Sequence, residues 1–165
     1  MTSAPFILER IFDAPSNLVW EAMTQAEHLM HWFGPTGTLD YATVELRQGG
    51  VFRYGIAAGG AVLRAKRTFT EIEPQQLFVT IAAYCDEAQN ITRHPFVPTW
   101  PLEMRIATTL TEQGGKTHML LDWSAHNATA EEQATFDAGH AMLKQGWDRA
   151  FDNLDARLRA MQGTA

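Results

Sequence analysis

The sequence predicts an α+β fold in which a curved antiparallel sheet wraps around one long C-terminal helix. Short runs rich in β-branched and aromatic residues are separated by Gly-Gly pairs, which is typical of an antiparallel meander. Two short helical stretches follow the first of these runs. Near the C-terminus, apolar residues recur at spacings of three and four, which predicts a long helix whose apolar face packs along a sheet.

The N-terminal part is expected to form one strand and two short helices. Residues 6–12 are rich in aromatic and β-branched side chains, so they predict the first strand. Ser16 or Asp13 is expected to cap the first helix. A second helix is predicted at about residues 26–32, where it ends before Gly34-Pro35.

The middle of the chain is expected to form six more strands. They are predicted over residues 38–47, 51–57, 61–72, 77–85, 102–110 and 117–124. Residues 86–101 interrupt this series and are too proline-rich for regular structure. Long loops of this kind are often functional.

The last element is predicted to begin near Thr129 and to be one helix of about eight turns. Thr129 and Glu132 have the spacing of a capping box, in which each side chain accepts a backbone hydrogen bond from the other residue. The apolar face comprises Phe136, His140, Leu143, Trp147, Ala150, Leu154 and Leu158. This face is expected to lie against the sheet.

Composition limits the function classes. The 165 residues fit a single domain, residues 1–165, with a net charge of -6. An acidic chain does not fit a nucleic-acid-binding protein or a polybasic membrane anchor. Cys85 is the single cysteine, so no intrachain disulfide is expected. We find no signal peptide or membrane-spanning run and expect a cytoplasmic protein without membrane insertion.

An ordered set of short motifs runs from residue 12 to residue 154. It comprises Phe12-Asp13-Ala14-Pro15, Val19-Trp20-Glu21-Ala22, Trp32-Phe33-Gly34-Pro35, Glu45-Leu46-Arg47-Gln48-Gly49-Gly50 with Phe52-Arg53, Glu71-Ile72-Glu73-Pro74 with Leu77, and Gly146-Trp147 with Leu154. With these motifs the chain resembles the activator-of-heat-shock-ATPase-like family of the START/SRPBCC superfamily, also called helix-grip proteins.

The resemblance implies the helix-grip fold but no single function. Members are described as small-ligand binders, chaperone regulators, stress-related proteins or uncharacterised proteins, and they share no catalytic set. No catalytic residue therefore transfers to this chain. The proline-rich loop at residues 86–101 departs from the family, and we expect the chain to lack the second domain of the eukaryotic chaperone activator. The missing domain argues against stimulation of a heat-shock ATPase.

Strand parity indicates which side chains line the hollow between sheet and helix. Phe52, Tyr54 and Ile56 share one face. Arg67 has the parity of Phe69 and is therefore expected to point inward unless a bulge reverses it. The candidate ligand-binding residues are Tyr54, Arg67, Trp100, Met104, Trp123, His140, Leu143 and Trp147, with Trp32 and Phe33 at the cavity mouth.

Each candidate has a plainer interpretation. Aromatic residues at strand or helix spacing are more often ordinary core, and His140 fits a satisfied core histidine as well as a polar group aimed at a ligand. In the binding hypothesis, the apolar wall supplies affinity, and Arg67 and His140 orient a carboxylate or hydroxyl group of the ligand.

Other chemistries have little support in the sequence. His28 and His31 could share a metal, but only Glu27 could complete the set, so no metal site is predicted. We find no phosphate-binding or dinucleotide motif and predict no cofactor. Cys85 precedes Asp86 and Glu87, and nearby carboxylates would raise the pKa of its thiol, which disfavours a nucleophile.

Three functions therefore remain as hypotheses. The first is binding of a small apolar or amphipathic molecule. The second is a protein-interaction module for a chaperone or another partner, which predicts an exposed apolar patch at residues 33–35 or 96–100. The third is an enzyme with His140 or Tyr54 as its acid or base. Monomer and homodimer both stay open.

Overall fold

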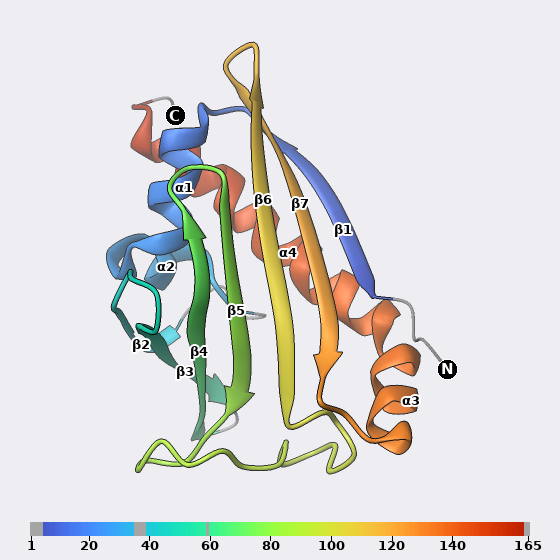
Figure 1. The fold of residues 1–165 in the computed structure, drawn as a ribbon. Coiled ribbons are helices and arrows are strands. Elements are labelled where there is room, and N and C mark those ends of the chain that lie inside the picture. Colours follow the sequence, from blue (N-terminus) through green and yellow to red (C-terminus); the bar gives the residue numbers. More distant parts are fainter. Residues whose placement is uncertain (1–4, 35–38, 59, 164–165) are drawn as a thin grey trace.

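A computed structural model describes residues 5–34, 39–58 and 60–163. Seven antiparallel strands form one curved sheet in the order β1-β7-β6-β5-β4-β3-β2, and α4 runs diagonally across one face of it (Figure 1). The strands are β1 (Phe6–Phe12), β2 (Leu39–Val44), β3 (Val51–Ala58), β4 (Ala61–Glu73), β5 (Leu77–Tyr84), β6 (Glu103–Gln113) and β7 (Lys116–His126). The helices are α1 (Ser16–Thr24), α2 (Ala26–Trp32), α3 (Ala130–Ala138) and α4 (His140–Met161). These elements confirm the predicted α+β helix-grip class and the order of its strands and of its first two helices.

Period-two alternation places the core on the face that α4 covers. In β1, Phe6, Leu8 and Phe12 are buried, whereas Ile7 and Ile11 are exposed on the opposite face. The other inward side chains of the sheet follow the same rule. The face of α4 that contacts them carries Ala150, Phe151, Leu154 and Leu158, all buried.

The prediction of one continuous helix from residue 129 is wrong, because Gly139 separates α3 from α4. The backbone N–H of Gly139 bonds the carbonyl oxygen of Thr135, and α4 begins at the next residue. A Cβ atom at Gly139 would lie 2.8 Å from Cζ3 of Trp100, so a side chain there would meet the indole ring. The capping box of α3 is confirmed, with Glu132 N donating to Thr129 Oγ1 at 3.1 Å.

The expected side-chain cap of α1 is also wrong. Neither Ser16 nor Asp13 caps this helix, whose N-terminal residue follows Pro15. The backbone N–H of Ser16 instead donates to Oε1 of Glu112, at 2.7 Å. A carboxylate from the end of β6 thus satisfies a free donor at a positively polarised helix end. The predicted strand start at residue 38 lies outside the described residues.

The loop between β5 and β6 has no regular structure, as its prolines predict. It is fixed by local and distant contacts. The Asp86 carboxylate accepts from the backbone N–H groups of Ala88 and Asn90, both at 2.9 Å. Arg93 forms an ion pair with Glu132 of α3, so the loop is fastened to the start of the C-terminal helices.

Candidate functional site

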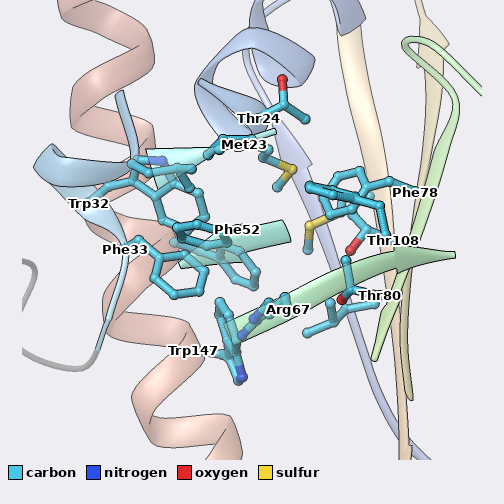
Figure 2. A pocket seen from close by; sticks show the side chains of 16 residues that line it. Met23, Thr24, Trp32, Phe33, Phe52, Arg67, Phe78, Thr80, Thr108 and Trp147 are labelled. Atoms are coloured by element: carbon cyan, nitrogen blue, oxygen red, sulfur yellow. The ribbon is translucent and has the colours of Figure 1, made fainter. Parts of the chain in front are cut away.

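A small cavity lies between the sheet, α2 and α4. Its volume is about 30 Å³, and its wall is largely apolar. The lining residues are Met23, Thr24, Leu29, Trp32, Phe33, Val44, Phe52, Arg67, Phe69, Phe78, Thr80, Thr108, Met119, Leu121, Trp147 and Phe151 (Figure 2). About two water molecules fit this space. Small-molecule sites usually exceed about 300 Å³, so a ligand must displace side chains to enter.

Arg67 is the cation of the cavity wall. It extends from β4 toward Trp147 (Figure 2) and is only 7% exposed. Its Nε donates to the hydroxyl of Tyr54 at 3.4 Å, which is long for a hydrogen bond. In the part of the chain that the structure describes, no carboxylate lies within 4.0 Å of its guanidinium.

Aromatic rings surround the guanidinium in place of an anion. The ring centre of Phe33 is nearest, 4.8 Å from Cζ of Arg67. The rings of Trp147, Trp123 and Tyr54 follow at 5.6, 5.7 and 5.8 Å. All four distances fall within the range of cation–π attraction, although three are near its limit. Arg67 points inward, as its strand position predicts.

Thr80 adds a second polar group to the apolar wall. It lies on β5, is 1% exposed, and its Oγ1 has no hydrogen-bond partner among the described residues. Thr24 differs, because its hydroxyl donates to the carbonyl oxygen of Trp20 at 2.6 Å. A buried hydroxyl without a partner is rare in folded proteins. Thr80 was not among the predicted residues, since both faces of its strand are apolar.

The structure divides the predicted residues into two groups. Arg67, Trp147, Trp32 and Phe33 line the cavity. Trp32 and Phe33 are 2% and 5% exposed, so they belong to its buried wall, and the predicted exposed patch at residue 33 is wrong. Pro35, the end of that predicted patch, lies outside the described residues.

Three further predicted residues support Arg67 from outside the cavity lining. Tyr54 and Trp123 present their rings to its guanidinium. Met104 lies behind Trp123 and accepts a hydrogen bond from its Nε1 through Sδ, at 2.9 Å. These residues therefore hold the wall in place without facing the enclosed space.

His140, Trp100 and Leu143 lie near the junction of α3 and α4, in a part of the core away from the cavity. The His140 ring centre is 4.9 Å from that of Phe136 and 5.6 Å from that of Phe6. Trp100 packs on Phe136 at 5.7 Å. Nε2 of His140 and Nε1 of Trp100 are buried and have no partner within the described ranges. None of these three residues lines the cavity around Arg67.

His28 is engaged by another side chain. Its Nδ1 accepts from Nε of Arg157 at 3.1 Å, and burial, followed by the Arg157 charge, lowers the pKa of His28. Among residues 5–34, 39–58 and 60–163, no group of three metal-ligating side chains can hold an ion. No helix within these ranges is long and apolar enough to span a membrane.

Side chains suited to acid–base chemistry lie outside the cavity lining. Burial raises the pKa of the Cys85 thiol more than the neighbouring Asp86 carboxylate does. Burial also raises the pKa of Tyr84 to about 12. Arg67 is the single ionisable residue that the described wall contains. This wall therefore provides no general acid or base that titrates near neutral pH.

Comparisons with known proteins agree with this architecture. The family model described as "Activator of Hsp90 ATPase homolog 1-like protein" matches residues 13–159. A Nitrosomonas europaea protein structure is 22% identical, with 97% of each chain covered and a TM-score of 0.76. An Arthrobacter aurescens protein structure is 22% identical, covers 96% of this chain and 87% of its own, and has a TM-score of 0.76.

A Staphylococcus aureus protein of unknown function is similar over 99% of this chain and 98% of its own, at 16% identity and a TM-score of 0.72. No curated protein sequence matches the chain. At these identities the solved structures establish the fold and leave the ligand and the reaction undefined.

Proposed function

The chain belongs to the family of activator of Hsp90 ATPase homolog 1-like proteins, and we propose that it binds a small amphipathic molecule between its sheet and α4. In this proposal residues 1–165 act as a single domain. The observation that carries it is a buried polar group, the Thr80 hydroxyl, which has no described protein partner and lines an apolar cavity.

An unpaired hydroxyl at this position has an energetic cost. A buried polar group without a hydrogen bond costs about 1 to 3 kcal/mol, and valine has nearly the same shape as threonine without the hydroxyl. Packing alone would therefore favour valine at position 80. Water can satisfy Thr80 in the empty protein, since the cavity holds about two molecules. A polar atom of a bound ligand would take the place of that water.

The apolar wall would supply most of the binding free energy. A ligand that buries about 300 Å² of apolar surface gains about 7 kcal/mol before the costs of association. The cost of moving the side chains that now fill the binding region reduces this favourable free energy. The aromatic side chains of Trp32, Phe33 and Trp147 are large enough to enclose a ligand of this size once they move.

Native mass spectrometry of freshly purified protein, compared with the denatured sample, tests this function. We expect a reproducible small-molecule mass that leaves on unfolding. Thr80→Val should keep the fold and retain less of this molecule. Thr117→Val is the control and should not change retention, because this buried threonine lies outside the cavity lining and its hydroxyl donates to the carbonyl oxygen of Ala14. A clean apo mass, together with no binding of a neutral apolar dye, would overturn the proposal.

Regulation of a protein partner is a second candidate, favoured by one exposed side chain. Phe96, in the loop between β5 and β6, is 77% exposed, and Val97 beside it is 37% exposed. The family description points to a heat-shock ATPase as the partner to test. Phe96→Ser should abolish any stimulation of that purified ATPase, and Met142→Ser, exposed by 78% on α4, is the matched control. Absence of stimulation by the unaltered protein rejects this candidate.

A further inference from the structure

Burial without a carboxylate partner distinguishes Arg67 from the other described arginines. Five arginines outside the core form ion pairs with carboxylates: Arg10, Arg47, Arg53, Arg64 and Arg93. Arg67 is the most buried of the arginines and has no such partner among the described residues. A buried charge is costly unless it is paired, and aromatic rings compensate for it only in part.

The chemistry of the missing partner follows from the charge of Arg67. A ligand ammonium group would be repelled by the guanidinium, and a neutral ligand would leave it unpaired. A carboxylate accepts parallel hydrogen bonds from the guanidinium fork in a geometry that few other groups match. The chain carries a net charge of -6, so attraction of an anion must come from this local cation and not from the overall field.

We propose that the ligand is an amphipathic carboxylic acid whose carboxylate pairs with Arg67 and whose apolar body lies among the aromatic rings of the cavity. This inference rests on the function proposed above and specifies the ligand class. Arg67 pairs in register with Ala82, and Thr80 lies two residues from Ala82 on the same face. Thr80 is thus a diagonal neighbour of Arg67, about 7 to 8 Å away, within reach of a second polar atom of the ligand.

Displacement of a neutral reporter dye tests this assignment. N-phenyl-1-naphthylamine carries no charge at neutral pH, so its binding reports the apolar cavity alone. Octanoate, 1-octanol and octylamine each have eight carbon atoms and differ in the head group. We expect octanoate to displace the dye at least tenfold more effectively than 1-octanol, because a carboxylate forms an ion pair with two parallel hydrogen bonds to the guanidinium, whereas a neutral hydroxyl forms no ion pair. Octylamine should be the weakest competitor.

Two arginines on β4 provide matched variants. Arg67→Met should bring octanoate and 1-octanol to equal effectiveness, each measured relative to the affinity of this variant for the dye. Arg64→Met, on the same strand, removes an arginine that pairs with Glu87 at the surface and should keep the octanoate preference. Circular dichroism establishes that both variants fold.

The unaltered protein gives an independent measurement if Arg67→Met does not fold. Acidification that protonates octanoate should remove its advantage over 1-octanol. Dye binding with no preference for octanoate, or with a preference that survives Arg67→Met or ligand protonation, overturns the carboxylate assignment and leaves the proposed function standing. No dye binding at all overturns both.

Discussion

Replacing Arg67 by methionine should stabilise the empty protein, because it removes a buried charge that has no anion. Taking a guanidinium out of water costs several kcal/mol. One ring centre lies at 4.8 Å and three lie at 5.6 to 5.8 Å, close to the limit of about 6 Å, so cation–π attraction returns only about 2 kcal/mol. Methionine has a similar length and fills the same space. We expect a net gain of about 2 kcal/mol in the free energy of unfolding.

Urea unfolding at constant slope measures this change, and thermal unfolding should show a midpoint higher by about 4 to 8 °C. Arg64→Met is the control and should change stability by less than about 0.5 kcal/mol, since its ion pair is at the surface. Saturating octanoate should narrow this difference by about 1.4 kcal/mol or more, because it binds the unaltered protein at least tenfold more tightly than Arg67→Met. A loss of more than about 1 kcal/mol in Arg67→Met would refute the reasoning and make Arg67 a structural residue.

Three further predictions concern stability. Gly139→Ala should lower the unfolding free energy by about 1 to 3 kcal/mol, because its Cβ would lie 2.8 Å from the Trp100 ring. Helix propensity alone predicts the opposite, so a higher thermal midpoint would contradict the predicted clash. Burial lowers the pKa of His28 and of His94 below 6.5, so the unfolded chain takes up protons at a higher pH than the folded chain, and the free energy of unfolding should fall as the pH drops below 6.5. His28→Gln should make this free energy depend less steeply on pH. An unchanged pH dependence would show that His28 does not contribute to it. Glu132→Ala should lower the free energy of unfolding in urea by about 1 to 2 kcal/mol, and Glu132→Gln should lower it less, because glutamine can keep the capping box. Equal losses in the two variants would show that the ion pair with Arg93 causes the effect.

The parts of the fold that depend on local pattern could be predicted from the sequence. Alternation in β4 gave the inward direction of Arg67, because successive side chains of a strand must point to opposite faces. The capping box could be predicted for the same reason, because it depends only on the nearby residues Thr129 and Glu132. The order of strands and short helices followed from turn residues and from the family motifs.

The parts that depend on tertiary contacts could not be predicted. The helix break at Gly139 fits against Trp100, a residue far away in sequence. His140 lies on the same helix as Trp147 but two turns nearer its start, where it packs against Phe6 and Phe136, so helix periodicity predicted its face and not its distance from the cavity. Thr80 left no signal, since its strand is buried on both faces and a threonine there resembles an ordinary β-former. The cap of α1 comes from Glu112, 96 positions later.

The small size of the cavity and the aromatic surroundings of Arg67 have one physical explanation. In the empty protein the Phe33 ring lies 4.8 Å from the guanidinium, close to the space that a ligand carboxylate would need. A carboxylate that pairs with Arg67 would approach to about 2.8 Å, and the cavity of about 30 Å³ has room for the rest of the ligand only after wall side chains move. An anionic ligand offsets the cost of this movement through its charge-assisted pair with Arg67. A neutral ligand has the same cost and makes no such pair, so the small cavity of the empty protein favours an anion.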